Sequence, residues 1–502
     1  MMKIDRSCIM FVTKNLRVSF VIFLVGFISF LIADLSISTV DTSLLVQDFF
    51  FSIVKLSFND YSILFEAFLN TISIAMVAIF ISAILGFFLA LFFQNMLVRI
   101  SLSFTRAIHE LFWALIFLQI FGLNTLTAIL AIIIPYSAIL AKVYAEILEE
   151  HDTFPETLRG KSRISYFIYT KIPDAFPHLV SYTLYRFECA LRSTAILGFV
   201  GITTLGYYLS SSFMQGYYHE VWMILILFYI VVASVKWWFN KYTFIPLTIA
   251  SFFYLDDFSG FNWDNLVRFV TSDIVPHPIR NDLGFDKTLA WFDNIFSNEI
   301  LPGVFNTIVL TQLALFLTAI LALLLFPLVS KKFFQKPTRL TSHIFLVILR
   351  STPEYILAYV FLQLFGPSML PAALALMLHN GSIIAHLMGN ETNLLSLRPD
   401  VTKKRNEKYF YEVLPRVYNQ FLAFLFYRWE IIMRESAILG ILGIATLGFF
   451  IDSAIADFRL DKMFLLLLIT AFLNIIVDLI SKKAREYLRA NDSFTSCGCS
   501  LK

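Results

Sequence analysis

Two stretches of the chain carry arginine and glutamate at helical spacing within otherwise apolar sequence. They are residues 185–209 and 427–451, and each contains the pattern Arg-x-Glu-x-x-x-Arg. The charged residues are Arg186, Glu188 and Arg192 in the first copy, and Arg428, Glu430 and Arg434 in the second. A charge at membrane depth costs roughly 2.5–3.5 kcal/mol on insertion scales, so six such charges indicate a functional site.

The spacing divides these charges into pairs and single arginines. Glu188 and Arg192 lie four residues apart on one helix face, which predicts an ion pair, and the second copy repeats this arrangement. All six residues, four arginines against two glutamates, are predicted to line a translocation pathway that favours a small anion. Arg186 and Arg428 have no sequence-local partner at helical spacing, so they are the residues left free to attract it. The competing interpretation is a structural cluster of ion pairs, with the single arginines bonded to backbone carbonyls.

The two stretches belong to a longer internal repeat. About half of their positions are identical at a constant offset of 242 residues, and residues 106–122 match residues 350–366 at a similar level. Equal numbers of apolar segments in both halves predict parallel repeats about an axis along the membrane normal, with the substrate path at their interface.

The composition is that of a polytopic membrane protein. Of the 502 residues, 58% are hydrophobic and 15% are charged, and the mean hydropathy is +0.75. The predicted fold class is an all-α membrane protein with about twelve transmembrane helices in two tandem six-helix repeats. The net charge of +3 gives no argument for a nucleic-acid partner.

Lysine and arginine are concentrated in alternate loops, which places both termini in the cytoplasm by the positive-inside rule. The predicted domains follow from the repeat and from this orientation. They are a cytoplasmic N-terminus (1–17), a first repeat (18–241, core 66–236), a second repeat (242–485, core 302–482) and a cytoplasmic tail (486–502).

Three glycines follow each charged pattern and are predicted to allow close helix contact or a local helix break. They are Gly198, Gly201 and Gly206 in the first copy, and Gly440, Gly443 and Gly448 in the second. No phosphate-binding loop of the Walker A type occurs, so any ATP must bind to another subunit. No cofactor, metal site or catalytic residue is predicted, and the Cys497-Gly-Cys499 tail is interpreted as disordered rather than metal-binding.

The segment 184–209 resembles the phosphonate-transport permeases, which are subunits of binding-protein-dependent ABC importers. It matches their pattern at Leu184, Tyr185, Arg186, Phe187, Glu188, Arg192, Ala195, Leu197, Gly198, Val200 and Gly201. Ala190 replaces an asparagine of the pattern, and Thr203-Thr204 replaces a Gly-Gly. The resemblance extends through both halves, from about residue 70 to 236 and from about 306 to 482.

The same family has a cytoplasmic coupling segment that ends in glycine and is followed by proline. The resemblance implies this role for Glu156, Arg159, Gly160 and Pro173 in the first half, and for Thr402 and Pro415 in the second. Because Thr402 stands where the glycine is expected, the first segment is predicted to dock its ATPase more like the family does.

The resemblance implies the permease of an ATP-driven importer, with two copies fused in one chain, that conducts phosphonate or a related phosphorus oxyanion. The implied partners are a cytoplasmic ABC ATPase dimer, a periplasmic or lipoprotein substrate-binding protein, and the lipid of the bacterial plasma (inner) membrane. One alternative is an importer permease for an amino acid, a thiamine precursor or phosphate. Another is a proton-coupled secondary transporter using Glu188, Glu430 or His379, although the arginine partners would keep both glutamates ionised.

Overall fold

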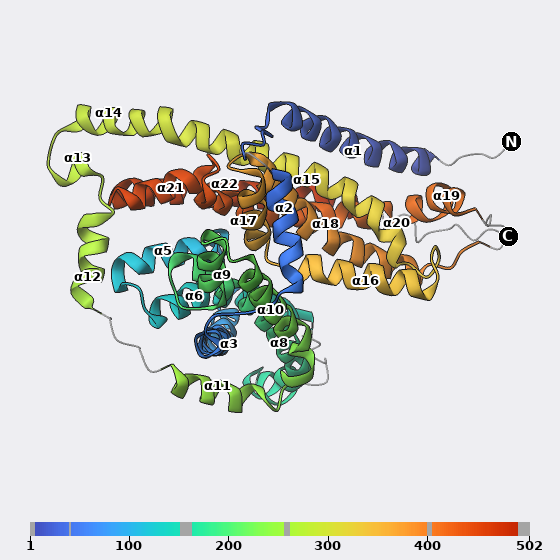
Figure 1. Cartoon of the computed structure of the whole chain (residues 1–502), viewed down its shortest axis with the longest axis horizontal. Helices are drawn as coiled ribbons and strands as arrows, with labels where there is room; N and C mark the ends of the chain where they lie inside the picture. Colours follow the sequence, from blue (N-terminus) through green and yellow to red (C-terminus); the bar gives the residue numbers. More distant parts are fainter. Residues whose placement is uncertain (1–5, 40–41, 151–162, 256–261, 399–403, 490–502) are drawn as a thin grey trace. The chain divides into compact units, whose positions relative to one another are not determined.

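The computed structural model describes residues 6–39, 42–150, 163–255, 262–398 and 404–489. Within these ranges the chain forms α-helices, short 3-10 and π turns and connecting loops, and it contains no strand (Figure 1). The predicted all-α fold class is confirmed.

Seven helices in the described part of the chain are long and apolar enough to cross a membrane. Four further pairs of helices pass the same test together but bend by more than 40° at a short break, so the number of spans rises to 11 if each pair is counted as one. The sequence predicts about twelve, and the additional segment is α11 (Phe244–Tyr254), an apolar helix of 11 residues. The chain is an integral membrane protein.

The bent pairs occur twice with nearly the same geometry. The α4–α5 pair (Met96–Ala107 and Glu110–Phe121) bends by 90°, and so does the α16–α17 pair (Lys336–Ser351 and Glu354–Phe365). The internal repeat of the sequence is therefore also a repeat of local geometry. The other two pairs bend by 47° and 42°, and they are α8–α9 (Ile172–Leu197 and Leu205–Met214) and α20–α21 (Leu414–Ile438 and Leu447–Ala456).

One of the two compact units of the chain comprises Ser43–Val275. Its central pair is α3 (Tyr61–Leu91) and α6 (Thr125–Glu150), and α8 packs against both. Gly86 of α3 permits the close approach of this pair, because a Cβ at that position would overlap the side chain of Leu140. The α10 helix (Tyr218–Trp238) packs on α9 and α8.

The other compact unit comprises Met1–Thr42 and Pro276–Lys502. Its central pair, α15 (Leu301–Val329) and α18 (Met369–Leu394), corresponds to α3 and α6 and approaches in the same way, with Gly381 facing Leu321. The α20 helix packs on α15, α18 and α22 (Leu460–Arg489). The core that carries the charged pattern is thus built in the same manner in each unit.

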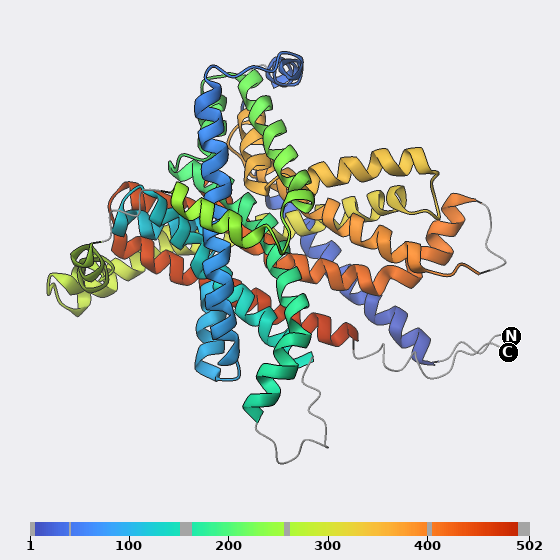
Figure 2. The same cartoon turned by 90° about the horizontal axis from the view of Figure 1, so that it is seen from below.

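The first apolar helix of each sequence repeat packs in the unit formed by the other repeat. The α1 helix (Arg6–Ile32) lies along α15, where the rings of Phe23 and Phe316 meet edge to face at 5.5 Å (Figure 1). The α11 helix crosses α3, where Phe244 and Phe80 meet at 5.8 Å (Figure 2). The boundaries of the sequence repeats and of the compact units therefore differ, because each compact unit includes the first apolar helix of the other repeat.

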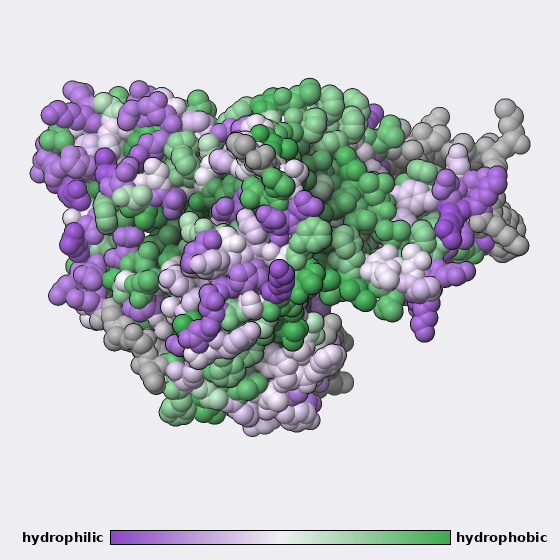
Figure 3. Space-filling view, in the orientation of Figure 1, coloured by the Kyte–Doolittle hydropathy of each residue, from purple (hydrophilic) through white to green (hydrophobic). Residues whose placement is uncertain are grey.

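The surface of the second of these units agrees with a membrane location. Apolar residues cover α1 in Figure 3, and they include Phe20, Phe27 and Leu31, which are all exposed. Hydrophilic residues gather instead over α13 (His277–Arg280) and around α19 (Arg405–Glu407). An exposed aliphatic and aromatic belt on a long helix is the surface that lipid chains solvate.

Candidate functional site

The two charged patterns lie on α8 and α20, which begin at matching prolines. Pro173 and Pro415 are each the second residue of their helix, which continues without a break from a preceding helical turn. Each proline therefore removes a hydrogen-bond donor within a continuous helical stretch. A π turn precedes each helix, at Phe167–Lys171 and Lys408–Val413. Arg186 and Arg428 each follow their proline at the same separation in sequence, so each lies roughly 20 Å along its helix at 1.5 Å per residue.

Arg186 contacts a phenol on its own helix. Its Nε and Nη2 atoms donate to the Tyr182 hydroxyl at 2.8 and 2.6 Å, and the guanidinium lies 5.1 Å from the centre of the Tyr182 ring. The prediction that Arg186 has no sequence-local partner is therefore wrong, because a hydroxyl one helical turn earlier accepts from it. The acceptor is neutral, so the contact leaves the positive charge of Arg186 in place.

The predicted Glu188–Arg192 ion pair is confirmed, although it is long. Arg192 Nη2 lies 3.9 Å from Glu188 Oε1, and the same nitrogen lies 3.6 Å from the Cys189 sulfur. The two charged side chains are 17% and 27% exposed for arginine and glutamate, so the pair is only partly buried. The corresponding Glu430–Arg434 pair of α20 stays a prediction.

Arg428 finds its contact on another helix. Its Nη1 atom donates at 3.4 Å to the Asn380 side-chain oxygen of α18. Asn380 in turn donates at 3.0 Å to Glu435, which lies on α20 with Arg428. The sequence could not predict this chain of contacts, because Asn380 lies 48 residues before Arg428.

The glycines after each charged pattern make the predicted helix break. Gly201 and Gly443 have φ values of +104° and +88°, which end the preceding 3-10 turn. Gly206 and Gly448 permit close contact, because a Cβ there would overlap the carbonyl oxygens of Ala195 and Ala437. Gly198 and Gly440 likewise face the start of the next helix, at the backbone nitrogens of residues 207 and 449.

A repeated Asn-Thr pair supports each break from a neighbouring helix. In the first half, Asn70 of α3 donates to the Thr203 carbonyl at 3.1 Å, and the Thr71 hydroxyl accepts the Leu205 N–H at 3.0 Å. In the second half, Asn306 and Thr307 of α15 make the same two contacts, to the Ala445 carbonyl and from the Leu447 N–H. The pair therefore satisfies backbone groups that the break leaves without helical partners.

A buried polar cluster lies beside the charged helix in the Ser43–Val275 unit. Ser193 of α8 donates to Glu110 of α5, and the Tyr136 hydroxyl of α6 lies 2.9 Å from the Ser193 hydroxyl. His109 Nδ1 lies 3.3 Å from the Glu110 carboxylate. Three helices thus contribute polar groups to one position, and the recurrence of Glu110 as Glu354 was its only sequence signal.

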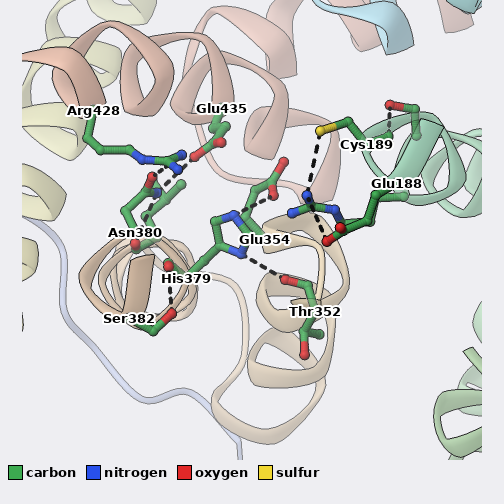
Figure 4. Close-up of polar contacts among 12 residues, drawn as sticks. Glu188, Cys189, Thr352, Glu354, His379, Asn380, Ser382, Arg428 and Glu435 are labelled. Atoms are coloured by element: carbon green, nitrogen blue, oxygen red, sulfur yellow. Dashed lines mark hydrogen bonds and ion pairs between the residues drawn. The ribbon is translucent and has the colours of Figure 1, made fainter. Parts of the chain in front are cut away.

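The other unit has a different cluster at the equivalent position (Figure 4). Glu354 of α17 lies 3.7 Å from His379 Nε2 of α18, and His379 Nδ1 lies 2.8 Å from the Thr352 carbonyl oxygen. Glu435 of α20 accepts from Asn380 and completes the group. The sequence names His379 only as a candidate of the proton-coupled alternative and gives no signal for Glu435, which follows directly after the charged pattern.

Four residues of the predicted coupling segments lie outside the described residues. They are Glu156, Arg159, Gly160 and Thr402. Of this set, Pro173 and Pro415 are described, and their matching positions at the start of α8 and α20 are given above. The docking role of these segments therefore stays a prediction.

The chain is similar to permease proteins of transport systems. It is 23% identical over 393 residues to the phosphate-import permease protein PhnE of Mycolicibacterium smegmatis, and the match covers 72% of each chain. It is 28% identical over 140 residues to the phosphite transport system permease protein PtxC of Stutzerimonas stutzeri. That match covers 27% of this chain and 51% of PtxC, so the chain spans about half the length of this relative.

A third relative, from Escherichia coli K12, is described as a candidate cryptic phosphonate transport system permease protein. It is 29% identical over 107 residues, which cover 21% of this chain and 88% of that protein. No family model and no solved structure match the chain. The resemblance to phosphonate-type permeases that the motif around Arg186 indicates is confirmed.

Proposed function

We propose that this chain is the membrane-spanning permease of an ATP-driven importer for a small phosphorus oxyanion. The observation that carries the proposal is the duplicated helix α8/α20, which holds arginines at matching depth in a chain similar to phosphate and phosphite permeases. Arg186 and Arg428 each contact a neutral oxygen, the Tyr182 hydroxyl or the Asn380 amide. Such arginines keep their charge and can exchange these oxygens for those of an anion.

The tetrahedral oxyanions fit this chemistry better than a zwitterion does. A guanidinium offers several N–H donors in one plane, and phosphonate, phosphite and phosphate present oxygens at a spacing that accepts two of them. An amino acid would also require a carboxylate for its ammonium group. Glu188 is the acidic residue of the pattern on α8, and it pairs with Arg192. This pair disfavours a role for Glu188 in binding an ammonium group.

The importer assignment includes partners that the chain itself does not contain. In the proposal, a dimer of ABC ATPases docks on the cytoplasmic segments around Glu156–Gly160 and Thr402, and a substrate-binding protein delivers the anion from outside. The distribution of lysine and arginine supports cytoplasmic termini. ATP binding by the partner alternates access by moving one repeat against the other.

The test is ATP hydrolysis by the complex that co-purifies with the tagged full chain from its native membranes. After reconstitution in vesicles, phosphonate, phosphite, phosphate and an amino acid are each added with the binding protein. The proposal expects stimulation by one or more phosphorus oxyanions and none by the amino acid. The purified chain alone should bind no nucleotide.

Two results would overturn the proposal in different ways. Stimulation by the amino acid alone would support the importer assignment but contradict the assignment of a phosphorus oxyanion as substrate. Uptake driven by a proton gradient in ATP-free vesicles, with no ATPase in the complex, would instead establish a secondary transporter.

A further inference from the structure

We propose that Glu354, His379 and Glu435 form a binding site for one divalent transition-metal ion, with Zn²⁺ as the best match. The three residues come from α17, α18 and α20, so a bound ion would join three helices of one unit (Figure 4). The proposal does not depend on which solute is transported, although Asn380 contacts both Glu435 and the proposed anion residue Arg428.

The donor atoms already lie close together. One nitrogen of His379 and one oxygen of each carboxylate all lie within 4.8 Å of one another, and His379 Nε2 lies 3.7 Å from Glu354 Oε2. Zinc binds nitrogen and oxygen at about 2.0–2.2 Å in a tetrahedral arrangement, which places neighbouring donors roughly 3.5 Å apart. Shifts of the donor atoms by about 1 Å, through side-chain rotation, would therefore complete the tetrahedral geometry.

Neighbouring groups orient two of the three donors. The Thr352 carbonyl oxygen lies 2.8 Å from His379 Nδ1 and can only accept, so Nδ1 carries a proton and Nε2 faces Glu354. A histidine held by a backbone carbonyl in this way presents the lone pair of its other nitrogen to a metal. Asn380 holds Glu435 at 3.0 Å from the opposite side.

The charges of the cluster favour a cation. His379 and Glu435 are only 3% and 6% exposed, and two carboxylates that meet away from water repel each other strongly. The positive charges of Arg428 and Arg434 act on Glu435 and offset part of this repulsion. The two arginines can neutralise the carboxylates without an imidazole. The His379 nitrogen that faces the carboxylates instead supplies an electron-pair donor of the kind that a metal ion binds.

The first repeat lacks a second carboxylate and has no histidine at the position of His379. The helices α5 and α6 place Pro135 where α18 has His379, and α8 places Ser193 where α20 has Glu435. Glu110, the counterpart of Glu354, accepts from the Ser193 hydroxyl. Among the described residues, the second carboxylate is thus present in one half and replaced by a hydroxyl in the other, where the imidazole beside Glu110 belongs to the adjacent His109 and not to the helix equivalent to α18.

The mixed donor set selects the kind of metal. Imidazole nitrogen with carboxylate oxygen suits zinc and similar transition metals, whereas magnesium and calcium prefer oxygen alone. The sequence predicts no metal site because its three donors are separated by 25 and 56 residues, without the short spacing that marks metal motifs.

The test is zinc binding by the full chain, purified with its partner subunits and without an affinity tag. The background is Cys497→Ser/Cys499→Ser, which removes the thiols of the tail. The protein is stripped with EDTA, exposed to ZnSO₄ or MgCl₂ and desalted, and its metal content is measured by mass spectrometry. The expected result is about one zinc and no magnesium per chain, on the ligand count of a single site.

The variants separate this site from adventitious binding. His379→Gln and Glu435→Gln should weaken zinc binding more than about 100-fold, since even the residues that orient metal ligands contribute 10–100-fold. Glu110→Gln, the matched change in the first repeat, should leave it unaltered. Equal losses in all three variants, or no loss in any, would overturn the proposal.

X-ray absorption at the zinc edge of the unsubstituted chain decides the matter if a variant does not fold. The site predicts one imidazole nitrogen and two or more oxygens at about 2.0–2.2 Å. A spectrum without imidazole scattering, or a chain that retains no zinc, would show that the three residues form an ion-pair cluster only.

Discussion

Arg186 and Glu188 lie two positions apart on α8 but have different surroundings. Arg186 bonds to a neutral phenol, whereas Glu188 pairs with the positive charge of Arg192. Spacing alone predicts the ion pair, because partners four residues apart on a helix always share a face. It does not predict the contact of Arg428 with Asn380, because the relevant spacing exists only after α18 and α20 have packed.

The single arginines are predicted to carry the anion. Arg186→Gln or Arg428→Gln should lower oxyanion uptake by about 10-fold or more, since a hydrogen bond to a charged group contributes roughly 1.5–3 kcal/mol. Thermal stability of Arg186→Gln should change little, because glutamine can keep a hydrogen bond to Tyr182. Arg428→Gln should lower it more, because this change also removes a positive charge that acts on Glu435. Uptake of radiolabelled anion and unfolding temperature, measured on the same preparations, test this expectation.

Glu188→Gln provides the control for that experiment. Breaking a fully buried ion pair costs roughly 3–5 kcal/mol, but a pair that is partly exposed and 3.9 Å apart should cost only about 1 kcal/mol. A small fall in unfolding temperature with uptake retained is expected. Normal uptake by both arginine variants would contradict the anion role and leave the cluster as scaffolding.

At the scale of elements, the helix break is the feature that the sequence describes best. The three glycines of each copy predict a break or a close contact, and the structure contains both. The sequence does not reveal the Asn-Thr support, because a short Asn-Thr pair at the start of an apolar segment has many possible uses. The support becomes visible only when α3 and α15 bring their hydroxyls to the first turns of α9 and α21.

The glycines are predicted to differ in how much they stabilise the fold. Gly206→Ala would place a methyl group onto the Ala195 carbonyl, so it should cost about 3 kcal/mol or more. Gly443→Ala meets no atom within 4 Å and should cost only about 1–2 kcal/mol for its left-handed backbone. Unfolding temperatures in detergent should follow this order, and the reverse order would count against the close contact.

The Asn-Thr support has its own test. Thr71→Val keeps the shape of the side chain but leaves the Leu205 N–H without its acceptor, which should cost about 1–3 kcal/mol. Thr307→Val should behave alike, because it removes the same contact from Leu447. Thr288→Val on α14 (Phe285–Ile295) is the matched control, since that hydroxyl is exposed and only caps a local turn. Similar unfolding temperatures for all three variants would argue against the support.

At the scale of the whole molecule, the exchange of α1 and α11 joins the two halves of the chain. Residue repeats report common ancestry of segments, so the sequence predicts two copies in tandem. The sequence cannot assign α1 to the unit of the second repeat. Apolar composition alone does not distinguish one helix from another as a packing partner, and the fit of their surfaces is known only from the structure. Here shape does decide: a Cβ at Gly26 would overlap the Phe316 ring, so α1 fits α15 through a glycine.

The exchange predicts that the chain can be cut and still assemble. Fragments 1–258 and 259–502, divided between α11 and α12 (Trp263–Arg268), should co-purify when expressed together, because α1 of the first fragment packs on α15 of the second. Gly26→Leu in the first fragment should reduce recovery of the second by roughly 5–150-fold, since overpacking costs about 1–3 kcal/mol. Val25→Leu is the matched control, because Val25 is 38% exposed and can accept the additional methylene. Recovery that is the same for both variants would mean that α1 does not hold the fragments together, and that the tandem chain depends on other contacts for its assembly.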